Sequence, residues 1–240
     1  MINDIINVFR NLPSNHLHHT FITFIIIIAL LAIRYKVKSN NIHLLDIYLG
    51  FLPIIIELLF QLQSIINREW SWIKTLPMEI SYLTSFAIPV FLFKPSRKLQ
   101  SWIFYIGIWS AAAAFLNTIM MGQEPWHMLL RYYGHHGILL YFGISIYISG
   151  YRPTLKDYYN TVKIMLLIIF IIGLINKIIG SNYMFTRFKP TGMNLTLLMA
   201  DWPYYFITIV SIGLVFCYLL YLIGRDKLYK SVKLPPNYNN

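Results

Sequence analysis

Seven long apolar stretches divide this chain of 240 residues, and they constrain its fold more than any other feature. Each stretch comes close to the roughly 20 residues that a helix needs to cross the hydrocarbon core of a bilayer. A soluble domain of this length would instead carry amphipathic helices with one polar face. The composition agrees, since 57% of the residues are hydrophobic and only 12% are charged. The sequence therefore predicts an all-α, polytopic membrane protein with seven transmembrane helices.

The predicted spans follow one another within a single membrane domain. They cover residues 16–33, 42–63, 75–93, 101–121, 134–150, 162–180 and 202–224. We expect residues 1–15 to form an extracellular segment, residues 16–224 the seven-helix domain, and residues 225–240 a basic cytoplasmic tail. The first apolar run has no small-residue cleavage site at its end, so we interpret it as a retained span. The Pro- and Asn-rich end of the tail, 234–240, is expected to be disordered.

Basic residues in the connections predict the orientation, because cytoplasmic loops retain Lys and Arg. Thirteen of the twenty basic residues lie in alternate connections and in the tail. They are Arg34, Lys36, Lys38, Lys94, Arg97, Lys98, Arg152, Lys156, Lys163, Arg225, Lys227, Lys230 and Lys233. The opposite side holds Arg10, Arg68, Lys74, Arg131, Arg187 and Lys189, and Lys177 can snorkel from a span. We therefore expect the amino terminus outside and the carboxyl terminus in the cytoplasm.

The charge and cysteine counts limit which partners and which covalent cross-links we expect. A formal net charge of +11 is mostly this topology signal, not a nucleic-acid footprint, so we expect membrane lipids as partners and no nucleic acid. The single Cys217 lies in the last apolar run and excludes an intramolecular disulfide. The Ile- and Lys-rich composition is typical of a multi-pass protein of a bacterial plasma membrane. The sequence does not predict a protein partner.

Polar residues within the spans gather near the outer side. Each one costs free energy unless it is paired or functional. They are His16 in the first span, Glu57 in the second, Glu79 and Ser81 in the third, Asn117 in the fourth, His135 and His136 in the fifth and Asn176 in the sixth, with Asn182 and Tyr183 just beyond. Spans that run in opposite directions thus place polar groups at one depth. We expect a shared chamber open toward the outer leaflet.

Each of these residues also has a structural interpretation. Histidines near an interface often serve as amphipathic anchors, which applies to His18, His19 and His135. Small polar residues such as Ser81 help helices to pack closely. Glu79 is alternatively a hydrogen-bonded structural group, and Glu57 alternatively pairs with Asn117 across two helices.

Taken together, the set suggests nucleophilic chemistry. A hydroxyl needs a base within hydrogen-bond reach, and His136 is a candidate base for Ser81. A carboxylate, Glu79 or Glu57, then orients the imidazole. On a regular helix Glu79 and Ser81 point about 200° apart, which opposes a common target unless the helix is distorted. A metal held by Glu79, His136 and His16 is an alternative, without a compact ligand motif; we expect neither a metal nor another cofactor.

Several short motifs also relate the chain to a known family. They are Asn15-His16-Leu17, Leu76-Pro77, His136-Gly137, Asn176 followed by Gly180-Ser181-Asn182-Tyr183, Lys189-Pro190, and Trp202-Pro203-Tyr204-Tyr205. On these motifs the chain resembles the YwaF-like integral membrane proteins, which are distantly similar to a eukaryotic family of phospholipid acyltransferases. The resemblance runs from about residue 16 to the end of the last span.

The resemblance implies an acyl-carrier cysteine, preceded by histidine, in the motif Leu-Pro-x-His-x-Cys. This chain has Glu79 and Ser81 at those two positions, whereas His136 matches the implied base. Serine is a weaker nucleophile than cysteine and depends more on its base. The resemblance therefore implies either an oxygen-ester version of the same chemistry or a branch that has lost it.

Two function hypotheses follow. The first is an acyltransferase or acyl hydrolase acting on membrane lipids, with Ser81, His136 and Glu79 as catalytic residues. Its substrate-binding residues would be His16, Glu57, Asn117, Asn176, Asn182 and Tyr183, of which Asn117, Asn182 and Tyr183 are candidate oxyanion donors. The second is a non-catalytic binder or transporter of a lipid or small molecule, in which Glu57, Glu79 and His136 recognise the ligand or carry protons. We find no internal repeat of the kind that many transporters have.

Overall fold

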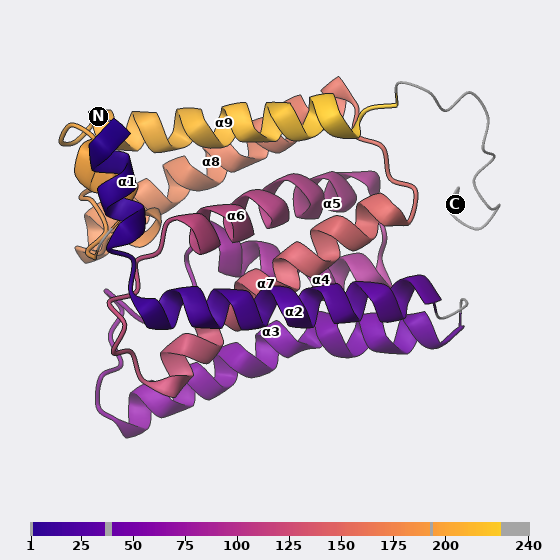
Figure 1. The fold of residues 1–240 in the computed structure, drawn as a ribbon, viewed down its shortest axis with the longest axis horizontal. Coiled ribbons are helices and arrows are strands. Elements are labelled where there is room, and N and C mark those ends of the chain that lie inside the picture. Colours follow the sequence, from indigo (N-terminus) through magenta and orange to yellow (C-terminus); the bar gives the residue numbers. More distant parts are fainter. Residues whose placement is uncertain (1, 37–39, 193, 227–240) are drawn as a thin grey trace.

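The computed structural model describes residues 2–36, 40–192 and 194–226. In this part of the chain the regular secondary structure is entirely helical, without a strand (Figure 1). Most of the expected basic tail, and all of its expected disordered end at 234–240, lies outside the described residues. The all-α prediction is confirmed for the part that the structure describes.

The helices follow the apolar stretches closely. They are α1 (Ile2–Arg10), α2 (Ser14–Lys36), α3 (Asn40–Ile66), α4 (Ile80–Phe93), α5 (Arg97–Trp102), η1 (Ile103–Gly107), α6 (Ile108–Leu116), α7 (Trp126–Ile148), α8 (Leu155–Ile179), η2 (Tyr183–Phe185), η3 (Leu195–Leu198) and α9 (Tyr204–Gly224). The π-helical segment η1 joins α5 to α6, so residues 97–116 form one continuous helical run.

Five helical segments among the described residues are long and apolar enough to cross a membrane. They are Ser14–Lys36, Leu44–Ile66, Arg97–Leu116, Leu155–Ile179 and Tyr204–Gly224. Helix α4, with 14 residues, is shorter, and α7, with 23 residues, carries several polar residues in its first half. The chain is thus a multi-pass membrane protein, and length with composition supports five of the seven expected crossings.

Three boundaries differ from the sequence-based expectation. Helix α7 begins at Trp126, directly after Pro125, and not at residue 134 where the continuous apolar run starts. Helix α4 begins at Ile80 and not at residue 75, with Glu79 in an extended conformation at its N-cap. Within the expected extracellular segment, Ile2–Arg10 forms the helix α1, whose apolar residues share one face. Such a helix is typical of a membrane interface.

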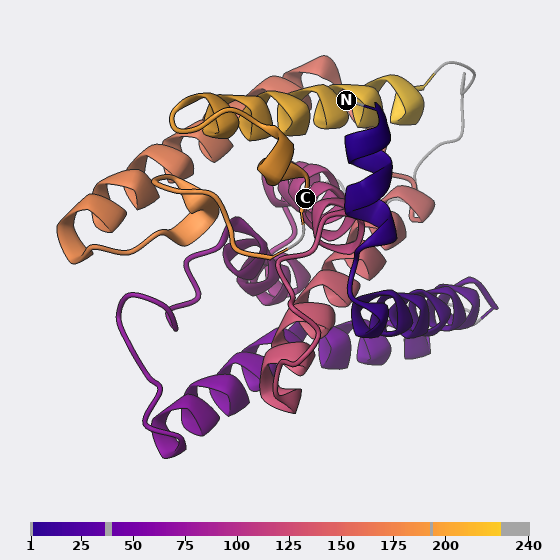
Figure 2. The same ribbon diagram turned by 60° about the vertical axis from the view of Figure 1, so that its left-hand side comes forward.

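The helices form a bundle with α7 at its centre. Helices α2 and α3 lie side by side on one flank, α8 and α9 pair on the other, and α4, α5, α6 and α7 lie between them (Figures 1 and 2). Helix α1 lies across one end of the bundle, close to η3 (Figure 1). Since α7 packs against α2, α3, α4, α6 and η1, its side chains can meet residues from most of the bundle.

Ion pairs tie the helices together at the end of the bundle away from α1. Asp46 on α3 accepts hydrogen bonds from Arg34 on α2 and, at 2.9 Å, from the hydroxyl of Tyr141 on α7. Asp157 on α8 accepts two bonds from Arg97 on α5, with Nη2 at 2.7 Å and Nε at 3.1 Å. These contacts hold α2, α3 and α7, and separately α5 and α8, in register.

Helix η1 approaches the backbone of α7 closely at Gly107, its last residue. A Cβ atom added there would lie 3.1 Å from the carbonyl oxygen of Leu139 on α7. Leu139 is fully buried, as are Ile103, Tyr105 and Ile106 in η1. Because backbone faces backbone at this point, the contact cannot be relieved by a side-chain rotation.

We expect Gly107→Ala to destabilise the protein by about 1–3 kcal/mol, because the new methyl group overpacks a rigid contact. Gly173→Ala in α8 is the matched control, since an added Cβ meets no atom within 4 Å there. That control should be neutral or stabilising by up to about 1 kcal/mol, as alanine is the better helix former. Thermal unfolding of the purified proteins in detergent measures both, and equal midpoints for the two variants would contradict the η1–α7 contact.

Candidate functional site

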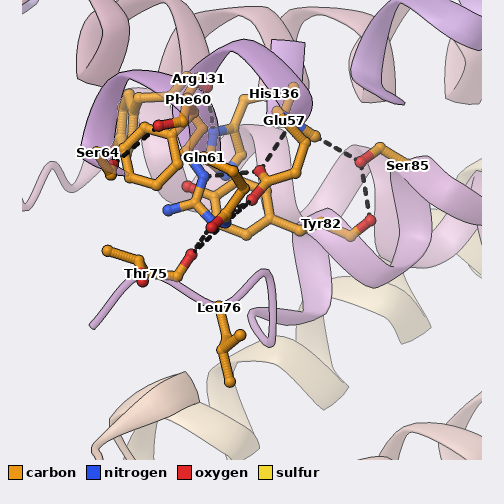
Figure 3. A network of polar contacts seen from close by, with 12 residues as sticks. Glu57, Phe60, Gln61, Ser64, Thr75, Leu76, Tyr82, Ser85, Arg131 and His136 are labelled. Atoms are coloured by element: carbon orange, nitrogen blue, oxygen red, sulfur yellow. Dashed lines mark hydrogen bonds and ion pairs between the residues drawn. The ribbon is translucent and has the colours of Figure 1, made fainter. Parts of the chain in front are cut away.

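A buried ion pair joins α3 to α7 in the middle of the bundle (Figure 3). Arg131 donates from Nε to Glu57 Oε2 at 2.8 Å and from Nη2 to Glu57 Oε1 at 3.0 Å. The two side chains are only 9% and 7% exposed. The bidentate geometry is the one in which a guanidinium and a carboxylate interact most strongly. The hydrogen-bonded Glu57–Asn117 pair that the sequence left open is not formed.

Aromatic rings enclose the guanidinium. The Cζ atom of Arg131 lies 3.9 Å from the ring centroid of Phe60 and 4.2 Å from that of Tyr82. Phe60 belongs to α3 and Tyr82 to α4, so the cation lies between two ring faces from different helices (Figure 3). Each contact adds cation–π attraction that grows as water is excluded.

The connection between α3 and α4 closes the pair from the outer end. Gln61 donates from Nε2 to Glu57 at 2.6 Å and to the carbonyl of Thr75 at 2.7 Å. Arg131 donates to the same Thr75 carbonyl at 3.1 Å, and Trp70 donates to Gln61 at 2.7 Å. These hydrogen bonds hold the connection against the ion pair.

A serine and a histidine meet beside the ion pair. Ser85 Oγ on α4 lies 2.6 Å from His135 Nδ1 on α7, and both residues are fully buried. The other ring nitrogen, His135 Nε2, lies 3.8 Å from Glu57 Oε2 and has no hydrogen-bond partner. A hydroxyl, an imidazole and a carboxylate therefore follow one another through three helices.

The Ser85 hydroxyl has one proton and two places to donate it. Its oxygen lies 2.9 Å from the carbonyl of Tyr82 and 2.6 Å from His135 Nδ1. When it donates to Tyr82, His135 donates from Nδ1 to the serine oxygen and Nε2 is unprotonated. When it donates to His135, Nε2 carries the ring proton and directs it at Glu57. Only the second arrangement prepares the hydroxyl for proton loss.

The predicted pair Ser81 and His136 lies on the same two helices. Ser81 is one turn before Ser85 on α4, so the two serines share one helix face. His136 follows His135 on α7, and consecutive residues point about 100° apart on a helix. His136 donates from Nδ1 to the carbonyl of Tyr132 at 2.6 Å, which leaves Nε2 as the acceptor. Among the described residues no hydrogen bond joins Ser81 to His136, and their catalytic roles stay a prediction.

Several predicted site residues organise the connection between α8 and α9. Asn176 is fully buried and donates to the carbonyl of Tyr183 and to the hydroxyl of Thr186, each at 2.7 Å. Its Oδ1 accepts from Ser181 and from the backbone N–H of Tyr183. Asn182 accepts from the backbone N–H groups of residues 187 and 188 and donates to the carbonyl of residue 188. The hydrogen bonds of both side-chain amides thus stabilise the conformation of this connection.

Two of the predicted residues fasten that connection to the residues that lead into α4. The hydroxyl of Tyr183 donates to the carbonyl of Trp72 at 2.8 Å and accepts from the N–H of Leu76 at 3.0 Å. Burial raises the pKa of Tyr183, so its hydroxyl keeps the proton that it donates. Glu79 Oε2 accepts from the N–H of Met184 at 2.9 Å. The connection therefore covers the end of α4 that leads to Ser81.

The remaining predicted residues, His16 and Asn117, lie closer to α6. His16 contacts the Tyr133 hydroxyl at 2.7 Å through Nδ1 and the Phe115 carbonyl at 3.1 Å through Nε2, so both ring nitrogens have partners. Asn117 accepts from the N–H of Leu195. In residues 2–36, 40–192 and 194–226, no group of three His, Cys, Asp or Glu side chains has the arrangement to hold a metal ion. The alternative of a metal held by His16, Glu79 and His136 thus gains no support.

Arg131 and Ser85 are the residues that the sequence analysis missed, and His135 was interpreted there as an interfacial anchor. A spacing signal could have found Arg131 and His135. Arg131 and His135 are four residues apart, as are Glu57 and Gln61, so each pair shares one helix face. A cation and an imidazole on one face of a helix, with a carboxylate and an amide on one face of another, are candidates for a buried network.

Similarity to known proteins gives one result. The model of the TMEM164 family, a membrane protein family, matches residues 12–221, which is most of the chain. No curated protein and no solved structure is significantly similar to this chain.

We expect Arg131→Gln to cost roughly 3–5 kcal/mol of stability, because it leaves the Glu57 carboxylate buried without a counterion. The double variant Glu57→Gln/Arg131→Gln should lose less than the sum of the two single changes, since it removes both charges together. Unfolding midpoints in detergent measure this cycle, with the exposed Lys177→Ala as control. Strictly additive effects would show that the two side chains do not depend on each other.

Proposed function

Because this chain belongs to the TMEM164 family, we propose that it transfers or hydrolyses an acyl chain of a membrane lipid through a buried Ser/His pair. The observation that carries the proposal is the 2.6 Å contact between Ser85 Oγ and His135 Nδ1, with Glu57 on the far side of the ring. A nucleophile within reach of a base, and a base near a third group, is the general arrangement for covalent catalysis.

The proposed reaction needs only these residues, the lipid ester and an acceptor for the acyl group. The Ser85 hydroxyl gives its proton to His135 Nδ1 while Oγ attacks the carbonyl carbon of an acyl ester. The ester C–O bond breaks, the imidazolium returns the proton to the leaving alcohol, and an acyl-serine remains. Water or the hydroxyl of a second lipid then takes the acyl group by the same steps in reverse. The Glu57 carboxylate attracts the imidazolium that forms in each half of the cycle.

A proline in α4 favours access to this buried pair. Pro89 in α4 has no N–H to donate to the carbonyl of Ser85, four residues earlier, so α4 is locally weakened beside the serine. Pro53 removes the corresponding bond in α3 at residue 49, farther from the pair. We expect a lipid ester to reach the fully buried Ser85 through movement of α4 near Pro89.

A second pair on the same helices, Ser81 and His136, is the alternative for the same chemistry. Ser81 stands at the position where the resemblance implies an acyl-carrier cysteine, and the unprotonated Nε2 of His136 suits a general base. The Glu79 carboxylate accepts a hydrogen bond from the backbone N–H of Met184, which favours a structural role for Glu79 over the orientation of His136. The alternative of a binder or transporter rests on the same polar residues without the chemical step.

We expect purified protein in phospholipid vesicles to release or transfer an isotope-labelled acyl chain, detected by mass spectrometry. Ser85→Ala and His135→Gln should lower the rate by about a hundredfold or more, as for other nucleophile–base pairs. Ser145→Ala is the matched control, because this buried serine on α7 has no hydrogen-bond partner for its hydroxyl.

Ser81→Ala and His136→Gln measured beside them decide between the pairs. If these two variants lose acyl turnover and Ser85→Ala retains it, Ser81 and His136 carry out the reaction. Absence of acyl turnover in the wild-type protein with all lipid classes would overturn the enzyme proposal and leave the binder or transporter.

For the topology we propose seven crossings of a bacterial plasma membrane, with the amino terminus outside and the carboxyl terminus in the cytoplasm. The alternation of helix directions supports this, because the carboxyl ends of α2, α7 and α9 and the amino ends of α5 and α8 lie away from α1 (Figure 1). Those ends carry the basic residues that cytoplasmic loops retain. A crossing by α4, about 21 Å long from its 14 residues, requires the bilayer to thin locally or adjacent residues to extend the span.

In a Cys217→Ala background, we expect Lys74→Cys to react with a membrane-impermeant maleimide in intact cells. Lys98→Cys should react only after permeabilisation, because α4 separates the two positions. Labelling of both variants in intact cells would show that α4 does not cross, and the reverse pattern would invert the topology.

A further inference from the structure

A surface cavity of about 400 Å³ lies in the connection between α8 and α9. Its lining consists of Arg187, Phe188, Lys189, Asp201, Trp202 and Tyr205. The connection is at the end of the bundle where α1 lies, which is the proposed outer end (Figures 1 and 2). We call these six residues the loop groove; the acyl chemistry proposed above does not use them.

The loop groove has a surplus of positive charge that an anion can use. Arg187 and Lys189 are cations, and Asp201 is the one carboxylate of the lining. Lys189 donates to Asp201 at 3.0 Å, but the Asp201 side chain is 97% exposed. Such an exposed ion pair contributes at most about 1 kcal/mol, so an incoming anion can replace the carboxylate at little cost.

Arg187 is anchored on one side only. Its Nη1 is 3.3 Å from the carbonyl of Ser181 and 3.4 Å from that of Asn176. Within the part of the chain that the structure describes, no carboxylate forms an ion pair with it. The rest of its planar fork of N–H groups is therefore available for the two oxygens of a phosphate, the geometry that guanidinium groups prefer.

Aromatic side chains give the loop groove an apolar half. Tyr205 is fully buried and donates its hydroxyl to the carbonyl of Phe185, which fixes the floor. Trp202 donates from Nε1 to the carbonyl of Thr186 at 2.9 Å while 60% of its surface stays exposed. A fixed, exposed indole beside cations is the arrangement that favours an amphipathic ligand at the headgroup level of a bilayer.

A short series of contacts links the loop groove to the proposed acyl site. Tyr205 holds Phe185, the neighbouring Met184 donates to Glu79, and Glu79 precedes α4. From Glu79 to Ser85 the helix rises about 9 Å. The loop groove and the start of α4 are therefore connected through residues 184 and 185.

We infer that the loop groove is a binding site for the phosphate of a glycerophospholipid from the adjoining leaflet. The inference rests on the charges and rings of the loop groove and does not depend on the proposed function. Arg187 and Lys189 pair with the phosphate oxygens, and Trp202 covers the glycerol end.

Native mass spectrometry of the purified protein, titrated with phosphatidylglycerol and with diacylglycerol of identical chains, tests the inference. Phosphatidylglycerol should bind the wild type more tightly than diacylglycerol does. Arg187→Gln/Lys189→Gln should weaken phosphatidylglycerol binding by about tenfold or more, the equivalent of one charge-assisted hydrogen bond. Lys74→Gln/Lys177→Gln removes two charges from the same end outside the groove and should leave binding unchanged.

Asp201→Asn provides a test that does not depend on losing a contact. It removes the competing carboxylate from an exposed position, so phosphatidylglycerol should bind more tightly. Equal binding by the wild type, the groove double variant and Asp201→Asn would overturn the inference. Displacement of the lipid by inorganic phosphate at equal concentration would show that the groove takes free phosphate and not a lipid.

The binding result is independent of turnover. Ser85→Ala should bind phosphatidylglycerol as the wild type does. If turnover exists, the groove double variant should raise KM for phospholipid with little change in kcat. Binding without turnover in the wild type would remove the acyl proposal and leave the loop groove standing as a lipid site.

Discussion

The buried pair of Glu57 and Arg131 is the interaction on which the centre of this protein depends. A charge inside a bilayer-spanning bundle is tolerated only with a partner, and here each charge satisfies the other through two hydrogen bonds. The pair also fixes what surrounds it. It joins α3 to α7, places Phe60 and Tyr82 on either side of the guanidinium, and holds the Thr75 carbonyl above it. His135 then has its position beside the same carboxylate.

The general architecture could be predicted from the sequence, because continuous apolar runs have few alternatives to membrane helices. Glu57 could be identified as a polar group that needs a reason to be inside a span. Its partner, Arg131, was missed because of where the span was taken to begin. The apolar run of the fifth span starts at residue 134, so Arg131 is counted with the loop charges, whereas α7 begins at Trp126 and carries Arg131 into the bundle.

The site residues divide by the same physical cause. Asn176, Asn182 and Tyr183 were identified by polarity and by the motif that carries the resemblance, and in the structure they fold and fasten the α8–α9 connection. Ser85 gives no signal of its own in the sequence, because a serine inside an apolar run is usually a packing residue. Its contact with His135 depends on the relative rotation of α4 and α7. Continuous apolar helices carry no periodic signal of that rotation.

The ion pair at the centre has a further consequence for how the protein responds to the membrane it spans. An electric potential across a bilayer does work on a net charge, about 2.3 kcal/mol for each charge and 100 mV. Glu57 and Arg131 carry opposite charges within one hydrogen-bond length, so they present the field with only a short dipole. Motions that keep the two side chains together therefore move no net charge across the membrane. The membrane potential thus does little work on this pair.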